Sequence, residues 1–107
     1  MPWTVQILND AVAAEIRSLP DDMHAKFIRL SERIEHAGLT SLREPHVKHL
    51  VGKLWEMRLT GRDGIARALY VAVEGERVVV LRAFMKKTRK TPRSEIELAM
   101  RRTEEIR

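Results

Sequence analysis

Six basic side chains lie close together between residues 82 and 93, and no acidic residue stands among them. They are Arg82, Lys86, Lys87, Arg89, Lys90 and Arg93. Like charges at this spacing repel one another, so the run is either a solvated surface or a site for an anionic partner. Phosphate suits such a site, because the planar guanidinium of arginine matches phosphate oxygens and lysine adds a compact positive charge.

The composition of the whole chain also favours a polyanionic partner. The 107 residues carry a formal net charge of +5, which suits nucleic acid, an acidic protein or anionic lipid without choosing among them. The absence of cysteine excludes a disulfide framework and fits a reducing compartment. No apolar run approaches the roughly 20 residues of a membrane helix, and the N-terminus lacks the pattern of a signal peptide. We predict a soluble, cytoplasmic single domain over residues 1–107, with no membrane partner.

Other chemical motifs are weak in this sequence. His46 and His49 are three positions apart, but no cysteine or carboxylate pair completes a set of metal ligands. Asp21 and Asp22 open a predicted helix and are explained by the helix dipole. Gly-rich phosphate loops and Gly-x-Ser-x-Gly motifs are missing. We therefore predict neither a metal site nor a cofactor.

Hydrophobic periodicity predicts the elements that position the basic run. Residues 3–8 alternate as a strand, with Trp3, Val5 and Ile7 on its buried face. Two helices follow, up to Gly38. Asn9 caps the first helix and Pro20 ends it. Residues 39–53 are predicted to be mostly loop, with room for a short extended piece at 47–51. Strands are predicted over 54–60, 65–74 and 77–84. A last helix follows, with Thr91 as its N-cap and Pro92 as its first residue.

This order, β-α-α-β-β-β-α, predicts an α+β fold in which a helical hairpin covers one face of a largely antiparallel sheet. The other face is expected to be open. Arg58 should point to that open face, because side chains alternate along a strand and Trp55 points to the helices. Arginine is rarely buried unless it is paired, so Arg67 is expected to reach an edge, a partner or an anion.

A meander brings the end of the last strand beside the start of the strand before it. Four basic residues are therefore expected to converge on one concave, phosphate-binding surface, namely Arg58, Arg67, Lys86 and Lys87. Tyr70 could add a stacking ring or a hydroxyl group. The alternative, a merely solvated basic face, stays open at this point.

Three segments together resemble a known family. They are "LWEMR" (54–58), "ARALY" (66–70) and "LRAFMKKTRKTPRSEIELA" (81–99), and they are similar to the RelE/ParE toxin superfamily. The resemblance is strongest to its HigB-like, phage-derived branch of type II toxin–antitoxin systems. It is close over about residues 50–102 and otherwise concerns the order of elements.

The resemblance implies a RelE-like fold and an endoribonuclease that inhibits translation by cutting mRNA on the ribosome. In such toxins the 2′-hydroxyl of the RNA attacks the adjacent phosphate, without a metal or cofactor. By position, Arg58 and Arg67 would hold the scissile phosphate, and Lys86 and Lys87 would bind RNA, one of them serving the leaving group. RNA contacts are also implied for Lys53, Tyr70, Arg89 and Lys90. No tyrosine or histidine follows Tyr70, so a lysine or His49 would act as the acid, or catalysis is mostly electrostatic.

The resemblance also implies partners. These are an antitoxin with a helix-turn-helix domain, the ribosome and its mRNA, and operator DNA only through the antitoxin complex. Two alternatives remain at this stage. One is a ParE-like inhibitor of DNA gyrase, and the other is a degenerate, non-toxic module that only binds an antitoxin.

Overall fold

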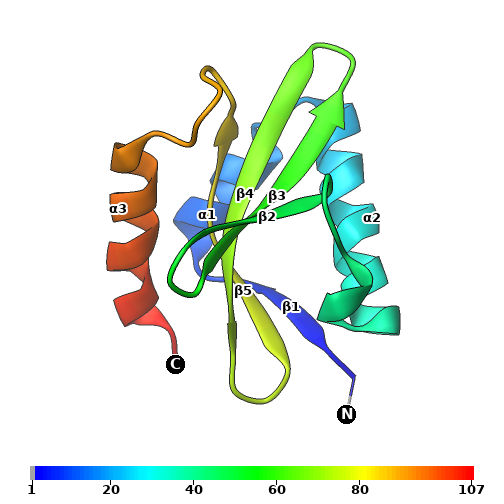
Figure 1. The fold of residues 1–107 in the computed structure, drawn as a ribbon, viewed down its shortest axis with the longest axis vertical. Helices are drawn as coiled ribbons and strands as arrows, with labels where there is room; N and C mark the ends of the chain where they lie inside the picture. Colours follow the sequence, from blue (N-terminus) through cyan, green and yellow to red (C-terminus); the bar gives the residue numbers. More distant parts are fainter. Residues whose placement is uncertain (1) are drawn as a thin grey trace.

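A curved five-stranded sheet forms the centre of the molecule, and three helices pack around it (Figure 1). The computed structural model describes residues 2–107. The elements are β1 (Thr4–Ile7), α1 (Asp10–Arg17), α2 (Asp21–Ala37), β2 (Val47–Val51), β3 (Leu54–Gly61), β4 (Gly64–Val73), β5 (Arg77–Met85) and α3 (Arg93–Arg102). Short 3-10 turns, Leu39–Ser41 and Thr103–Glu105, follow α2 and α3. The predicted α+β class is confirmed.

The strands lie in the order β1-β5-β4-β3-β2. From β2 to β5 they form an antiparallel meander, and β1 pairs in parallel with β5 at the opposite edge. Gly75 has a positive φ of 84° in the tight turn between β4 and β5, which favours glycine there. The sheet is thus largely antiparallel, as predicted.

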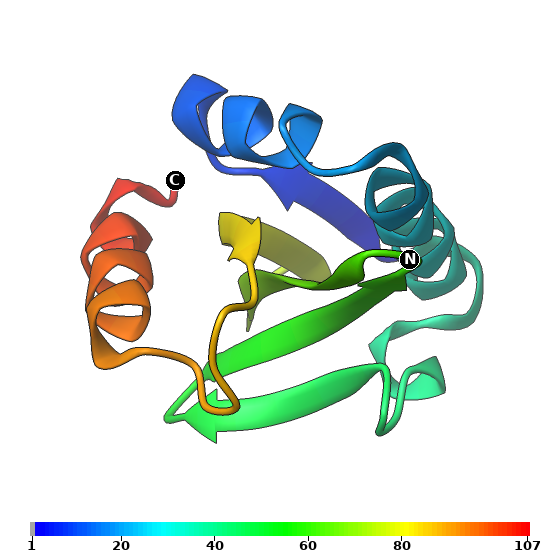
Figure 2. The ribbon, with the colours of Figure 1, turned by 90° about the horizontal axis from the view of Figure 1, so that it is seen from above.

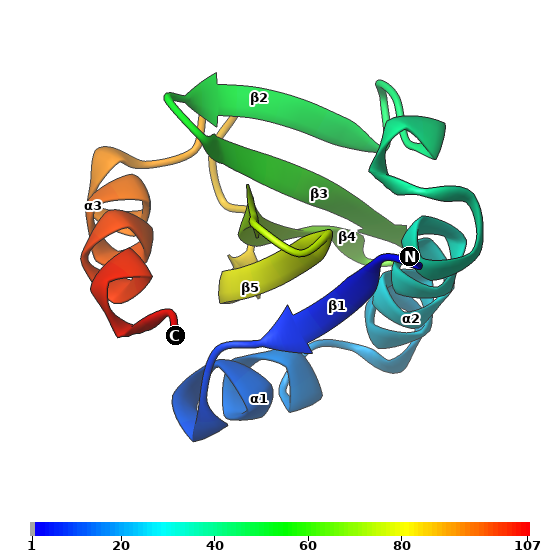
Figure 3. The same cartoon turned by 90° about the horizontal axis from the view of Figure 1, so that it is seen from below.

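Helices α1 and α2 cover one face of the sheet, and their apolar stripes form the larger core with it (Figure 3). Met23, Phe27 and Leu30 of α2 recur at steps of three and four and are buried. Asn9 caps α1 as predicted, because its side chain accepts a hydrogen bond from the N–H of Val12 at 3.0 Å. The predicted helical hairpin is therefore confirmed.

Helix α3 lies on the other face of the sheet, which the sequence had suggested would be open (Figure 2). Ala99 of α3 is fully buried and packs with Leu69, Val79 and Leu81 in a second core. The expectation of an open face is wrong over β4 and β5, because those strands are apolar on both faces and need cover on both. The accessible part of this sheet face lies towards β3, β2 and the loop between β5 and α3.

The extended piece expected at 47–51 is confirmed as an edge strand, β2, which pairs with β3 and adds one strand to the predicted order β-α-α-β-β-β-α. Two local predictions need correction. Ile7 is 41% exposed at the other edge of the sheet, so only Trp3 and Val5 of the predicted trio pack against the core. Helix α3 begins at Arg93 with Pro92 before it and no side-chain cap, because the Thr91 hydroxyl is bonded elsewhere.

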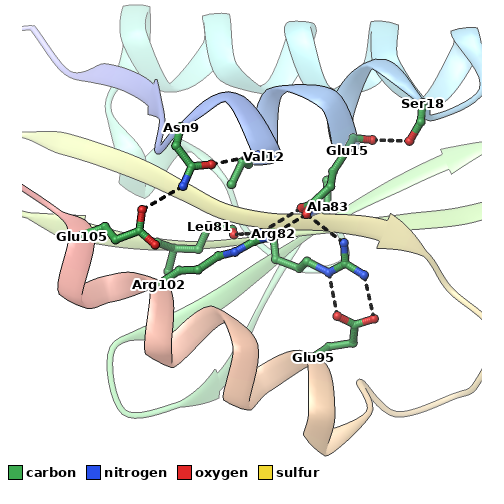
Figure 4. Close-up of polar contacts among 10 residues, drawn as sticks. All are labelled: Asn9, Val12, Glu15, Ser18, Leu81, Arg82, Ala83, Glu95, Arg102 and Glu105. Carbon is green, nitrogen blue, oxygen red and sulfur yellow. Dashed lines mark hydrogen bonds and ion pairs between the residues drawn. The ribbon is translucent and has the colours of Figure 1, made fainter.

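A cluster of alternating charges ties α1 and α3 to β5 (Figure 4). The Glu15 carboxylate accepts hydrogen bonds from Arg102 at 2.9 and 3.1 Å and from the N–H of Ala83 at 3.2 Å. Arg82 lies 3.1 Å from Glu15 and donates to both oxygens of Glu95, at 2.7 and 3.1 Å. These bonds fix α3 relative to the sheet, and with it the loop that carries the basic run.

No helix within residues 2–107 is long and apolar enough to cross a membrane.

Candidate phosphate-binding site

Three of the four predicted phosphate ligands lie together on the α3 side of the sheet. Arg58 of β3 stands directly opposite Arg67 of β4 in the strand register. Lys86 follows β5, and its N–H donates to the carbonyl of Ile65 at 2.8 Å, so the chain passes beside the start of β4. The meander therefore brings together residues that span 28 positions in sequence, 58 to 86.

Arg67 does not reach the surface; of the expected edge, partner or anion, the structure shows partners within the chain. Its side chain is only 3% exposed, and its guanidinium is committed to the loop after β5. Nη1 donates to Thr91 Oγ1 at 2.5 Å, and Nη2 donates to the carbonyl of Arg89 at 2.5 Å. Nε lies 3.6 Å from the buried Glu56 carboxylate. These partners satisfy both terminal nitrogens and balance the charge of the buried arginine, while Nε makes no hydrogen bond among the described residues.

Lys86 lies in the positive field of the arginines around it. Partial desolvation lowers the pKa of Lys86, and the nearby charges of Arg67, Arg58 and Arg89 lower it further, while Glu56 opposes them. Within residues 2–107, the side chains of Arg58 and Lys86 make no hydrogen bond or ion pair. A lysine of lowered pKa next to an uncommitted arginine can both attract a phosphate and give up a proton.

The loop after Lys86 extends the basic surface. Lys87, Arg89 and Lys90 are all exposed. The loop has internal support as well, because the Thr88 hydroxyl donates to the carbonyl of Lys90 at 2.6 Å. These three cations therefore follow Lys86 on a segment that this hydrogen bond stabilises.

Tyr70 and Lys53, two of the predicted RNA contacts, lie outside this surface. Tyr70 is 2% exposed and packs in the core beneath α1 and α2, on the opposite face of the sheet, where burial raises the pKa of its hydroxyl. Its position after the last arginine of β4 suggested a role beside that arginine, but it is three residues from Arg67 and so faces the other way. Lys53 is exposed in the β2–β3 turn, five residues from Arg58 and hence roughly 17 Å along the strand.

The sequence reasoning missed three residues at the site. Glu56 is buried beside Arg67, and Lys48 of β2 stands opposite Glu56 in the register. The carbonyl of His46 accepts a hydrogen bond from the N–H of Arg58 at 2.8 Å. Alternation along β2 would have placed Lys48 correctly, had that segment been recognised as a strand.

A hollow beside Arg58 gives the surface some depth. Its volume is about 230 Å³, and Glu44, Pro45, Val47, Lys48 and Arg58 line it. His49, considered above as an acid, lies away from it, because its ring packs on Trp55 with centroids 5.1 Å apart. Among residues 2–107, no group of three or more His, Asp or Glu side chains is placed to hold a metal ion. The arrangement suits charge stabilisation by Arg58, Lys86 and the loop cations.

Comparison with known proteins identifies the family. Residues 14–104 match the family model described as Phage derived protein Gp49-like (DUF891), which is well over half of the chain. The chain belongs to this Gp49-like family. A search of curated proteins found no match. The resemblance to a phage-derived family, predicted from the three segments, is thus confirmed.

Among solved structures, the Gp49-like chain is similar to a chain in the crystal structure of the archaeal RelE–RelB complex from Pyrococcus horikoshii OT3. The TM-score is 0.59 and the sequence identity is 23%, over 84% of this chain and 100% of that one. At this identity the similarity concerns the fold. The predicted RelE-like fold is confirmed.

Proposed function

We propose that this protein is the toxin of a type II toxin–antitoxin system, and that it cleaves mRNA on the ribosome. The observation that carries the proposal is the convergence of Arg58, Lys86 and an exposed basic loop on one face of a RelE-like fold. The net charge of +5 agrees with binding to a polyanion of this kind.

The reaction follows from what the site can stabilise. The 2′-oxygen of one nucleotide attacks the adjacent phosphorus, the bond from phosphorus to the 5′-oxygen breaks, and the products carry a 2′,3′-cyclic phosphate and a 5′-hydroxyl group. Arg58 stabilises the charge that grows on the phosphoryl oxygens. Lys86 donates a proton to the departing 5′-oxygen, a role for which its lowered pKa suits it. Solvent accepts the proton of the 2′-hydroxyl.

Four exposed cations serve the RNA and ribosome contacts in this proposal. Lys87, Arg89 and Lys90 bind backbone phosphates beside the cleaved one, and Lys53 reaches a separate stretch of ribosomal RNA. An antitoxin neutralises the toxin by laying an acidic segment over the same basic surface. Its helix-turn-helix domain then carries the complex to operator DNA.

Induced expression in bacteria tests the function. We expect growth arrest, rescue by co-expression of the adjacent antitoxin gene, and new mRNA ends that primer extension places within translated codons. The new 5′ ends should accept phosphate from polynucleotide kinase without prior phosphatase treatment, because they carry hydroxyl groups. The Arg58→Ala variant should lose most of the toxicity, whereas Arg33→Ala, an exposed arginine on α2, should retain it.

The other outcomes separate the alternatives. Intact mRNA together with DNA damage would replace this proposal with gyrase inhibition. Growth without arrest, with the antitoxin still bound, would replace it with a binding module that has lost its activity.

A further inference from the structure

The buried Arg67 connects the centre of the sheet to the loop that carries the basic side chains. Its two terminal nitrogens donate to the Arg89 carbonyl and the Thr91 hydroxyl, and Nη2 also lies 3.5 Å from the carbonyl of Thr88. These partners are 21 to 24 positions away in sequence. A loop of exposed, mutually repelling cations therefore has its backbone bonded to a side chain in the interior.

Glu56 and Thr91 complete this arrangement. The Thr91 hydroxyl accepts from Arg67 and donates to Glu56 Oε2 at 2.5 Å. Glu56 is 2% exposed, and its carboxylate lies 3.6 Å from Arg67 Nε, which has no hydrogen-bond partner among the described residues. The carboxylate balances the buried guanidinium, and the hydroxyl joins the two to the loop.

We propose that Arg67, Glu56 and Thr91 form a buried latch, in which Arg67 acts as a positioning residue that holds the loop from Lys86 to Thr91 in its cleavage-competent shape and does not touch the RNA. The proposal rests on the function proposed above and assigns Arg67 a role other than that of a phosphate ligand. A displacement of about 1 Å at a reacting group lowers a rate on the order of a hundred-fold. A loop held in one shape should therefore support faster cleavage than a mobile loop with the same charges.

The latch has an electrostatic side too. The charge of Arg67 contributes to the lowered pKa of Lys86, although the two side chains share no hydrogen bond. Arg58, Arg89 and Glu56 also face Lys86. Desolvation and the charges of Arg58 and Arg89 would keep part of the lowering in the absence of Arg67, while Glu56 opposes it. Charge and geometry can therefore be separated by choice of substitution.

Four variants separate the two effects. Thr91→Val keeps the shape of the side chain and removes the hydroxyl that joins Arg67 to Glu56. Arg67→Lys keeps the charge but cannot donate to the Arg89 carbonyl and Thr91 together, and Arg67→Met removes both charge and donors. Thr4→Val, an exposed threonine on the far edge strand, is the matched control.

The readouts are single-turnover cleavage of mRNA on programmed ribosomes, NMR order parameters of the amides of residues 88–91, and NMR titration of Lys86. Urea unfolding identifies any variant that fails to fold. We expect Thr91→Val and Arg67→Lys to cleave on the order of ten- to a hundred-fold more slowly, with unchanged half-saturation and with greater motion of the loop. The pKa of Lys86 should stay lowered in Arg67→Lys and rise in Arg67→Met.

Two results would overturn the latch. In the first, Thr91→Val cleaves like the wild type and its loop stays ordered, while Arg67→Lys is slow; Arg67 would then contact the RNA itself. In the second, the loop is as mobile in the wild type as in Arg67→Met. If the wild type does not cleave mRNA but the loop loosens in Thr91→Val, the latch stands and the proposed function fails.

Discussion

Arg82 and Lys86 are four positions apart in one basic run, yet their surroundings differ completely. Arg82 forms ion pairs with Glu15 and Glu95, and these carboxylates raise its pKa. Arg93 pairs with Glu97 one helical turn along α3, at 3.2 Å. Lys86 faces only arginines and a buried carboxylate that is already bonded to Thr91. The run therefore divides into residues that hold the structure together and residues available to a ligand.

The charge on Lys86 should oppose folding while serving the reaction. Its folded pKa is lowered, so the folded state loses this proton at a lower pH than the unfolded state does, and stability rises with pH between the two values. We expect Lys86→Met to have a urea midpoint at pH 7 no lower than that of the wild type. Cleavage of mRNA on ribosomes should fall by roughly 10²–10⁴-fold if the lysine is the acid.

Lys26→Met is the control for this experiment, because Lys26 is a partly exposed lysine on α2, away from the proposed RNA surface. A marked loss of stability in Lys86→Met together with unchanged cleavage would show that Lys86 supports the loop and takes no part in proton transfer.

At the scale of elements, α3 is held by charge as well as by packing. Only Ala99 of this helix is fully buried, so its apolar contact with the sheet is narrow. The bonds of Glu15 with Arg82 and Arg102 add the remaining attachment, and they join α1 to α3 across the end of β5 (Figure 4). Since the basic loop leads into α3, this anchor also limits where the loop can lie.

Glu15→Gln should weaken the anchor in a pH-dependent way. Burial by itself would raise the pKa of Glu15, but the bonds from Arg102 and the Ala83 N–H, with the charge of Arg82, lower it overall. The stabilisation is therefore present above the unfolded pKa and is lost as pH falls through the folded one. We expect the variant to lose roughly 1–3 kcal/mol of unfolding free energy at pH 7.

Urea unfolding at pH 7 and at about pH 3 checks this prediction. The difference from the wild type should shrink as the pH falls, because the wild type loses this stabilisation as its Glu15 takes up a proton. Glu97→Gln, which breaks only the exposed pair on α3, should change stability by about 0.5 kcal/mol or less. Equal losses at both pH values would argue for lost packing instead of lost charge.

A second element contact joins the β3–β4 turn to the start of α2. The Asp22 carboxylate accepts a hydrogen bond from the N–H of Arg62 at 2.6 Å, and a Cβ on Gly61 would come within 2.7 Å of the same carboxylate. We expect Gly61→Ala to lower the unfolding free energy by about 1 kcal/mol, because the exposed Asp22 carboxylate moves and loses its hydrogen bond with the N–H of Arg62. In a double-mutant cycle, Asp22→Ala should relieve most of this loss, whereas additive effects would show that the clash is not its cause.

At the scale of the whole molecule, the proposed RNA surface lies on one side, although exposed arginines such as Arg29 and Arg33 also lie on α2. The loop between β5 and α3 lies away from α2, on the opposite side of the sheet (Figure 1). We expect a polyanion to bind at the Arg58 and Lys86 surface, and the net charge of +5 should speed its approach.

The salt dependence of RNA binding tests this asymmetry. Each phosphate contact with single-stranded RNA contributes roughly 0.7 to the slope of log K against log[salt]. We expect Lys87→Ala or Arg89→Ala to reduce the slope by about that amount, and Arg33→Ala on α2 to leave it unchanged. Fluorescence anisotropy with a labelled oligonucleotide measures it, and equal effects on both sides would indicate binding without a defined surface.

Much of this architecture could be predicted, because the signals involved are local. The stripe of Met23, Phe27 and Leu30, the cap at Asn9 and the alternation along β3 each depend on neighbours within a few positions. β2 was predicted only as a short extended piece within a loop, because the neighbouring proline, glycine and histidine residues obscured a strand whose pairing is with β3. The apolar residues on both faces of β4 and β5 implied that an element packs on each face. The apolar stripe of α3 was too weak to identify that helix as the one on the second face.

The sequence by itself determined the element order apart from β2, the family, the convergence of Arg58, Arg67 and Lys86, and the excess of positive charge. Side chains alternate along a strand and the turns of a meander are short, so the order of residues largely fixes which side chains share a face and lie close together. Only the tertiary structure decided that Arg67 is buried and Lys86 is not. That outcome depends on Glu56 and Thr91, which are 11 and 24 positions from Arg67, and a buried guanidinium is tolerated only where such distant partners meet.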